Sequence, residues 1–176
     1  VLFPRIDQLP DELVEQVAVS VLNRLGAGDP AVSAVVLGAL IARLEARLGP
    51  DHQMTLNALS ARANFGSDVG DQTGRVDAIQ RVLASYDRQG RTDEALMAAL
   101  GLAMAQTDAG DMDAALRTYE SALSRARTPE QRSPVLRNWG LALREADRPE
   151  PAELRLTEAV RGVSTVPVIA SGGAGG

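Results

Sequence analysis

One stretch in the second half of the chain shows its hydrophobic pattern most clearly. Residues 110–126 read GDMDAALRTYESALSRA. The apolar and small side chains recur at steps of three and four, at Met112, Ala115, Leu116, Tyr119, Ala122 and Leu123. That spacing places them on one face of a helix, while most charged residues fall on the other face. Alanines at positions 115 and 122 let a neighbouring helix approach closely, so we expect tight packing of helix against helix.

Similar segments follow one another along the chain and are separated by links rich in glycine and proline. The predicted helices begin near residues 10, 29, 52, 75, 92, 110, 128 and 149. Residues 66–74 (GSDVGDQTG) predict a loop, because three glycines and two aspartates hold a helix poorly. Thr92-Asp93-Glu94 and Thr128-Pro129-Glu130 are typical helix starts. We therefore expect an all-α domain over residues 10–163, made of about eight antiparallel helices.

The two ends of the chain depart from this helical pattern. Val1–Leu9 is interrupted by Pro4 and predicts an extended lead-in. Residues 164–176 (STVPVIASGGAGG) predict a Gly-rich, non-helical tail in which Val166–Ile169 is β-like. One hypothesis is that Val166–Ile169 packs in a groove of its own chain or of a second copy, which would make a homo-oligomer through the tail.

Composition and charge narrow the classes of partner. The chain is 45% hydrophobic and 23% charged, as in ordinary folded proteins, and its net charge is −5. Residues 1–120 hold 17 acidic and 10 basic residues, and no basic cluster occurs that could neutralise several phosphates. No apolar run reaches the roughly 18 residues of a membrane span. We expect a cytoplasmic protein that binds neither nucleic acid nor membranes.

Few side chains in this sequence could carry catalysis or bind a metal. Cysteine and lysine are absent and His52 is the one histidine, which excludes disulfides, a cysteine nucleophile and a Schiff-base lysine. Asp68 and Asp71 are the best metal candidates, but the alternating acids of a calcium loop are missing. His52 could act as a base beside Asp51, although a capping or turn role is favoured. We therefore expect no enzyme activity, no metal and no cofactor.

Internal repeats point to one family. The hexapeptides GRVDAI (74–79), GDMDAA (110–115) and DRPEPA (147–152) align at offsets of 36 and 37 residues. A helical hairpin repeated at about this period resembles the tetratricopeptide repeat (TPR) family, whose first helix carries a large-then-small pair and whose second helix carries a small, a bulky and another small residue. The two best matches are Leu102-Ala103 with Ala115, Tyr119 and Ala122, and Trp139-Gly140 with Ala152, Leu156 and Ala159.

The earlier part of the chain resembles this family less closely. Residues 45–57 (EARLGPDHQMTLN) are similar to the junctions of longer-period TPR arrays in bacterial signalling proteins and kinesin light chains. Ile79, Leu83 and Tyr86 stand where this alignment expects small residues, and the loop at 66–74 is long. The alignment leaves four repeats, or three repeats and an atypical cap.

The resemblance implies a right-handed α-α superhelix with a concave groove lined by the first helices. The implied groove residues are Asn57, Ser60, Asn64, Met97, Leu100, Met104, Arg137, Leu141 and Arg144. A polar end, an apolar middle and a cationic end suit an extended or helical peptide with a hydrophobic anchor and an acidic flank. Two simpler interpretations stay open: Met97 and Met104 as core residues, and Arg137 and Arg144 as a solvated face.

The favoured function is a protein–protein interaction scaffold that binds a protein or peptide in its groove, as a module of a bacterial regulatory or signalling protein. The first alternative is a small-ligand sensor domain, which requires an enclosed pocket with convergent polar groups. The second is a self-associating scaffold whose open groove holds the tail of another copy.

Overall fold

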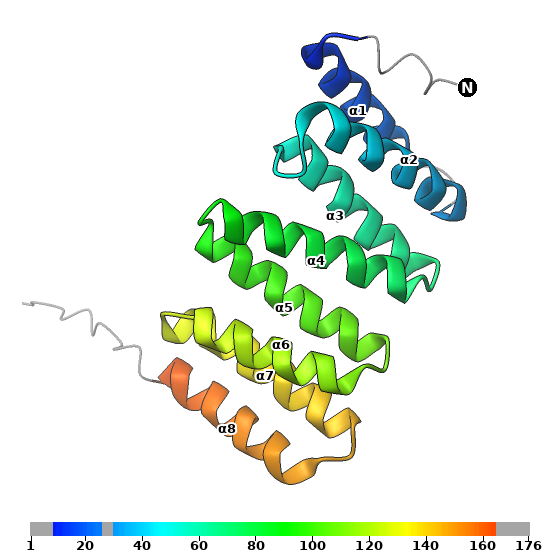
Figure 1. Cartoon of the computed structure of the whole chain (residues 1–176). Helices are drawn as coiled ribbons and strands as arrows, with labels where there is room; N and C mark the ends of the chain where they lie inside the picture. The colour runs from blue at the N-terminus through cyan, green and yellow to red at the C-terminus, as the bar shows by residue number, and fades with distance from the viewer. Residues whose placement is uncertain (1–8, 26–29, 165–176) are drawn as a thin grey trace, which may run out of the picture. The chain divides into compact units, whose positions relative to one another are not determined.

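A computed structural model describes residues 9–25 and 30–164 of the chain. The predicted lead-in, apart from Leu9, and the predicted tail beyond Ser164 lie outside the described residues. The described part is all-helical, as predicted, and contains no strand (Figure 1). Its helices are α1 (Asp11–Leu25), α2 (Pro30–Leu48), α3 (Gln53–Asp68), α4 (Gln72–Arg88), α5 (Thr92–Asp108), α6 (Met112–Arg125), α7 (Pro129–Glu145) and α8 (Pro149–Ser164).

The chain divides within α6 into two compact units, Val1–Thr118 and Tyr119–Gly176. In the first unit α2 packs on α3, α3 on α4 and α4 on α5, while in the second α7 packs on α8. Three-residue turns join the packed pairs α3–α4, α4–α5 and α7–α8, so these helices run antiparallel. None of the described helices combines the length and the apolar character needed to cross a membrane.

The predicted loop over residues 66–74 is wrong, because helix occupies both of its ends. Helix α3 continues to Asp68 and α4 begins at Gln72, which leaves a turn of three residues. Gly66 suits the close approach of the two helices, since a Cβ there would lie 3.0 Å from the carbonyl oxygen of Asp71. Asp71 caps α4 by accepting a hydrogen bond from the backbone N–H of Gly74 at 2.9 Å. The glycines and the aspartate therefore support the helices that they were expected to break.

The turns between helices share one backbone device. Gly70, Gly90 and Gly110 occupy the middle of three such turns with φ of +72°, +67° and +79°, a conformation that glycine adopts without steric cost. In the turn between α7 and α8 the middle residue is Asp147, with φ of +56°. There the N–H of Arg148 donates to the carbonyl of Leu143 at 2.9 Å and satisfies a free carbonyl at the end of α7.

The predicted helix starts have mixed outcomes. Thr128 begins α7 as expected and forms a capping box, in which its side chain and that of Gln131 each accept from the other residue's backbone N–H. Thr92 does not cap α5, because the N-cap is Arg91, whose side chain makes no capping hydrogen bond. His52 has the predicted capping role in α3, since its Nδ1 accepts from the backbone N–H of Met54 at 3.2 Å.

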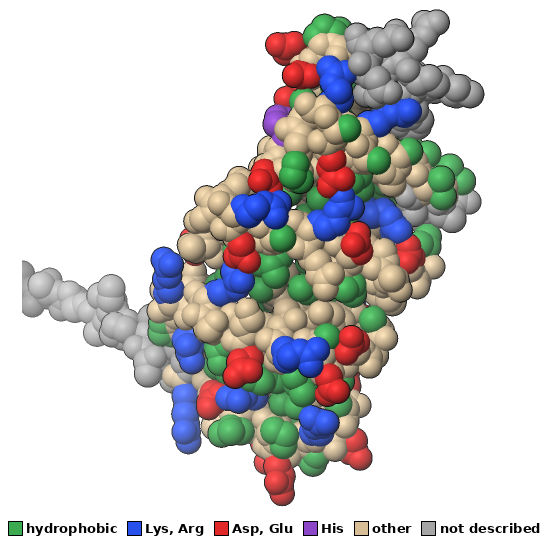
Figure 2. All heavy atoms as spheres, viewed as in Figure 1, with side chains coloured by type: hydrophobic (Ala, Val, Ile, Leu, Met, Phe, Trp, Pro, Cys, Tyr) green, Lys and Arg blue, Asp and Glu red, His purple; other side chains and the backbone are tan. Residues whose placement is uncertain are grey.

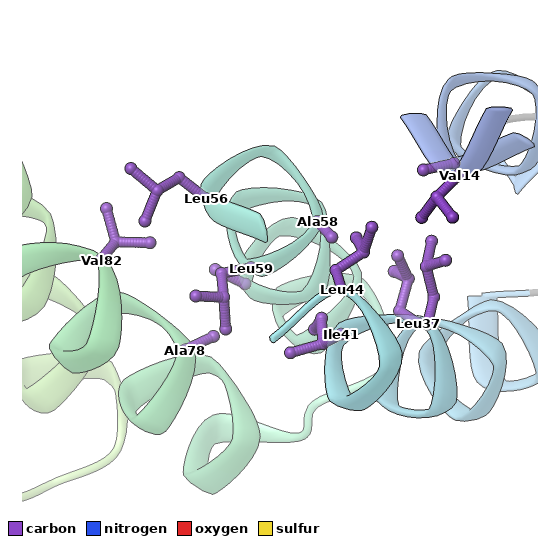
Figure 3. Close-up of a cluster of buried hydrophobic side chains, with 12 residues drawn as sticks. Val14, Leu37, Ile41, Leu44, Leu56, Ala58, Leu59, Ala78 and Val82 are labelled. Atoms are coloured by element: carbon purple, nitrogen blue, oxygen red, sulfur yellow. The ribbon is translucent and has the colours of Figure 1, made fainter. Parts of the chain in front are cut away.

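The core of the first unit is built from buried aliphatic faces of α1 to α4, while Leu13 of α1 and Val32 and Val35 of α2 are exposed. Aliphatic side chains of α1 to α4 converge between the helices, and Figure 3 shows Val14 facing Leu37 and Leu59 lying close to Ala78. Ion pairs lie outside this core: Arg81 of α4 pairs with Glu45 of α2, and Arg88 of α4 pairs with Asp51 in the turn before α3. Over the middle of the face shown in Figure 2, acidic and basic side chains are accordingly interspersed.

The size of the buried side chains repeats with a constant spacing of 37 residues across both units. The large-then-small pairs are Phe65-Gly66, Leu102-Ala103 and Trp139-Gly140. The small–bulky–small sets are Ala78, Val82 and Ser85, then Ala115, Tyr119 and Ala122, then Ala152, Leu156 and Ala159. All of these residues are buried except Phe65 and Leu156, which are partly buried.

This spacing corrects the alignment made from the hexapeptides. GDMDAA and DRPEPA begin at the turn residues Gly110 and Asp147, whereas GRVDAI begins inside α4, at Gly74. Helix α4 begins six residues before Ala78, whereas α6 and α8 begin three residues before Ala115 and Ala152, so the start of GRVDAI is not equivalent to the other two starts and the alignment was one residue out of frame. The expected departures at Ile79, Leu83 and Tyr86 therefore do not arise, since Ala78, Val82 and Ser85 take those places.

Candidate functional site

The described surface of the first unit contains two adjoining pockets between α3 and α5, above α4. One has a volume of about 450 Å³ and the other about 460 Å³, and both are lined by Ala63, Asn64, Ile79 and Gly101. Because they share these residues, we treat them as one depression and call it the α3–α5 groove. A drug-sized or peptide ligand occupies pockets of this order of volume.

The floor of the α3–α5 groove is apolar. Helix α4 contributes Ile79, Val82 and Tyr86, while α3 contributes Ala63 and α5 contributes Ala98. Gly101 leaves room above this floor, since a Cβ added there would meet no atom within 4 Å. The small side chains on α3 and α5 thus keep open a surface that larger residues would fill.

The rim of the groove is exposed and mixed in chemistry. Met97 of α5 is 65% exposed and lies at the first pocket, opposite Ser60 and Asn64 of α3. Met104 is 40% exposed and lines the second pocket. A contiguous apolar surface rimmed by polar residues is typical of a binding site.

Carboxylates stand on the same rim. Asp93 and Glu94, in the first turn of α5, line the first pocket, and Asp68 lines the second. A hydrogen bond from its own backbone N–H, and then one from Arg91, lowers the pKa of Glu94 below its ordinary value. Glu94 is therefore ionised at neutral pH, next to a surface that is otherwise largely apolar.

Arg91 links this acidic rim to the floor. Its guanidinium donates to Glu94 Oε1 at 2.9 Å and lies 4.5 Å from the centre of the Tyr86 ring. A further hydrogen bond of 3.1 Å joins Arg91 to Gln53 of α3. These three contacts hold Tyr86 and Glu94 in fixed positions at one end of the groove.

The structure gathers part of the predicted groove set in the first unit. Ser60, Asn64, Met97 and Met104 line the α3–α5 groove, and the exposure of both methionines removes the alternative that they are core residues. Asn57 is exposed but lies outside these pockets, where its side chain accepts a hydrogen bond from Gln53 at 2.9 Å.

Leu100 is not a groove residue, since it lines neither pocket and only 7% of it is exposed. Successive residues of a helix are about 100° apart around its axis, so position 100 lies about 60° from Met97. Ala98 and Gly101 lie on the other side of Met97, and that is the side on which the groove runs. Of the three residues predicted on α5, Met97 and Met104 therefore line the groove and Leu100 does not.

The remaining predicted site residues belong to the second unit. Arg137, Leu141 and Arg144 are exposed on α7, at steps of four and three that place them along one strip of the helix. Leu141 is 37% exposed. Their role in binding stays a prediction.

Several groove residues were missed by reasoning from sequence. Ile79, Val82 and Tyr86 come from α4, a second helix, and were assigned to packing between helices. Asp93 and Glu94 were interpreted only as helix-start residues. The sequence did contain a signal for the α4 residues. Ile79, Val82 and Tyr86 are spaced by three and four residues, which marks an apolar side of α4, and Ile79 and Tyr86 directly follow the small residues Ala78 and Ser85.

Of the three residues considered for metal binding or catalysis, Asp71 and His52 have structural partners, while Asp68 lines the second pocket. Asp71 caps α4 and pairs with Arg62, and these contacts lower its pKa, with the hydrogen bond from Arg62 as the largest cause. His52 caps α3 and its Nε2 lies 3.3 Å from Glu15 Oε1. Among the described residues, no three His, Asp or Glu side chains gather in a group that could hold a metal ion.

Comparison with known proteins gives no assignment. The chain matches no family model and no curated protein sequence.

Proposed function

We propose that the chain is an α-α repeat array of the tetratricopeptide type and binds a segment of another protein in the α3–α5 groove. The observation that carries the binding proposal is the conjunction of an apolar floor with a methionine that is 65% exposed on its rim. Burying one leucine-sized side chain on such a floor contributes about 1.5–3 kcal/mol to binding. A cytoplasmic location and a place in a bacterial regulatory protein belong to the same proposal.

The constant 37-residue spacing supports the repeat assignment. Helices α3, α5 and α7 each carry a large-then-small pair, and α4, α6 and α8 each carry a small, a bulky and a small residue, which is the pattern that the family resemblance implies. Small residues at these positions allow neighbouring helices to pack closely. At Gly140 of α7, for example, a Cβ would lie 2.7 Å from Cγ of Leu156 in α8. Stacked hairpins of this kind leave one face for ligands, which supports a binding function.

The groove is better suited to a peptide than to a small sensor ligand. A small ligand is usually enclosed on most of its surface. Here Ser60, Asn64 and Met97 are all exposed at the mouth, so the first pocket opens to solvent along one side. An open depression with exposed apolar residues fits a chain that lies across it.

Peptides selected from a random displayed library on the purified protein test this proposal. The best peptide is measured by fluorescence anisotropy against wild type, Gly101→Leu and Gly38→Leu. Both glycines are helical and a Cβ at either meets no atom within 4 Å, but only Gly101 lines the groove. We expect Gly101→Leu to weaken binding by about tenfold or more, as for the loss of one anchor, and Gly38→Leu to bind as wild type does. Equal affinities for all three proteins would refute the assignment of the groove.

A further inference from the structure

We propose that the α3–α5 groove selects a segment in which a bulky apolar side chain is flanked by lysine or arginine. This inference rests on the proposed function, because it names the class of partner for the same groove. Its basis is the position of three carboxylates around an apolar floor. Asp93 and Glu94 line the first pocket, and Asp68 lines the second.

The acids occur at both ends of the groove. Along α5, the groove extends from Glu94 to Met104, which at 1.5 Å per residue is about 15 Å. An extended peptide covers about 15 Å with four or five residues. Such a segment can therefore place an apolar side chain over the floor while its neighbours reach the acidic ends.

The basic side chains near the groove are already engaged with other acids. Arg91 pairs with Glu94 and stacks on Tyr86. Arg75, which lines the second pocket, donates to Asp108 at 2.5 Å and to Gln72 at 3.3 Å. Because Arg91 is matched by Glu94 and Arg75 by Asp108, neither guanidinium adds an uncompensated positive charge beside the floor.

The charge of the whole unit has the same sign. Residues 1–118 contain 16 acidic and 10 basic residues, whereas residues 119–176 contain 7 acidic and 8 basic residues. A net negative unit attracts cationic segments over distances of about a Debye length, which increases the rate of encounter. Local and long-range electrostatics therefore favour the same class of partner.

This assignment reverses the flank that the sequence predicted. The acidic flank was inferred from Arg137 and Arg144, which belong to the second unit. In the first unit, the charged residues that line the two pockets of the α3–α5 groove are Asp68, Asp93, Glu94 and Arg75. A peptide with acidic residues beside its anchor would place like charges together at this groove.

The four methionines make a direct test possible. The full chain is labelled with ¹³C-methyl methionine, which gives signals for Met54, Met97, Met104 and Met112. Met97 and Met104 report on the groove, while Met54 lines a different acidic pocket with Glu12 and Glu15. Three matched probes are titrated: the capped peptides Ac-GRLLRG-NH₂, Ac-GQLLQG-NH₂ and Ac-GELLEG-NH₂.

We expect the arginine peptide to shift the Met97 and Met104 signals most, with an affinity about fivefold or more above that of the glutamine peptide at low salt. The difference should shrink at high salt because surface charges are screened. The double variant Asp93→Asn/Glu94→Gln should lower the ratio of the affinity for the arginine peptide to the affinity for the glutamine peptide, and that ratio is the quantity compared with wild type. Asp113→Asn, an exposed acid in the first turn of α6 and outside the groove, should leave both affinities unchanged.

The outcomes separate this inference from the proposed function. Equal binding of the arginine and glutamine peptides at Met97, or stronger binding of the glutamate peptide, would overturn the basic flank and leave the groove as a binding site. A larger response at Met54 than at Met97 would place the preference for arginine elsewhere. No response of Met97 or Met104 to any of the peptides, combined with failure of the library selection, would overturn both proposals.

Discussion

Gly140 offers the sharpest test of how the second unit is packed. It lies inside α7, where alanine would normally stabilise a helix by about 1 kcal/mol relative to glycine. At this position an alanine Cβ would lie 2.7 Å from Leu156 Cγ, 2.9 Å from Leu156 Cδ2 and 3.1 Å from the carbonyl oxygen of Ala152. The backbone oxygen cannot rotate away, so α8 has to move from α7.

The expected magnitude follows from two opposing contributions. Overpacking by one methyl group costs about 1–3 kcal/mol, against the gain of about 1 kcal/mol in helix propensity. We therefore expect Gly140→Ala to lower the free energy of unfolding by about 1 kcal/mol. Gly38→Ala is the matched control, because Gly38 is also helical and a Cβ there meets nothing within 4 Å. That control should raise the free energy of unfolding by about 1 kcal/mol.

Urea unfolding gives the measurement. Trp139 is the one tryptophan and precedes Gly140, so its fluorescence reports on the second unit, while far-UV circular dichroism follows the helices of both. With an m-value of about 2 kcal/mol/M, each variant should move its midpoint by about 0.5 M, in opposite directions. In a Leu156→Ala background the two closest contacts are removed and only the contact with the Ala152 oxygen remains, so Gly140→Ala should cost clearly less than in wild type.

One result would refute this reasoning. If Gly140→Ala raised the midpoint as much as Gly38→Ala did, the spacing of α7 and α8 would not depend on the absence of a side chain. The small member of each large-then-small pair would then have no packing role, and the support that the 37-residue spacing gives to the repeat assignment would weaken.

Three further predictions concern caps, turns and pH. His52→Ala should lower the free energy of unfolding by about 1 kcal/mol, and His52→Asn by clearly less because asparagine can also cap α3; equal losses in urea melts would contradict the capping role. Asp147→Gly should raise the free energy of unfolding by about 0.5–1 kcal/mol, because this turn requires positive φ. Gly110→Ala should lower the free energy of unfolding by about 1 kcal/mol for the same reason. Thermal melts in which both changes have the same sign would argue against the turn geometry. Asp71 has a lowered folded pKa, so its stabilisation is present above the unfolded value of about 3.9 and is lost as pH falls through the folded value. The stability difference between wild type and Asp71→Asn should therefore shrink from neutral pH to about pH 2, and a constant difference in urea midpoints would refute that linkage.

Much of the fold could be predicted because helix formation depends on local patterns. Steps of three and four apolar residues located the helices, and glycine marked the turns at Gly90 and Gly110. The boundary between α3 and α4 was missed because a count of glycines ignores where they lie. Gly66 sits at a close helix contact and Gly74 in the first turn of α4, and neither needs an unusual backbone conformation.

The groove was harder to predict because its two walls and its floor come from three helices. A periodic pattern shows which side of one helix is apolar, but it does not show how far that side extends beneath a neighbour. Met97 and Leu100 share one stripe in the sequence, yet one is 65% exposed and the other 7%. Only the packing of α4 between α3 and α5 decides which edge of the stripe stays open.

The 37-residue frame separates the positions that form the fold from those that could give binding its specificity. At buried places the frame conserves size: Gly66, Ala103 and Gly140 are all small, although they lie in different hairpins. At the surface places it does not, as Ser67, Met104 and Leu141 are equivalent by spacing, are all exposed and differ in chemistry.

If stability alone shaped these surface positions, small polar residues would suffice at each of them, because exposed methionine and leucine contribute little to folding. Met104 also lines the α3–α5 groove, so contact with a partner would give its apolar side chain a role. Replacing Met104 with serine, the residue at the equivalent Ser67, should leave the urea midpoint nearly unchanged and weaken the peptide selected on wild type by about fivefold or more. A large loss of stability with no loss of binding would instead show that Met104 serves the core.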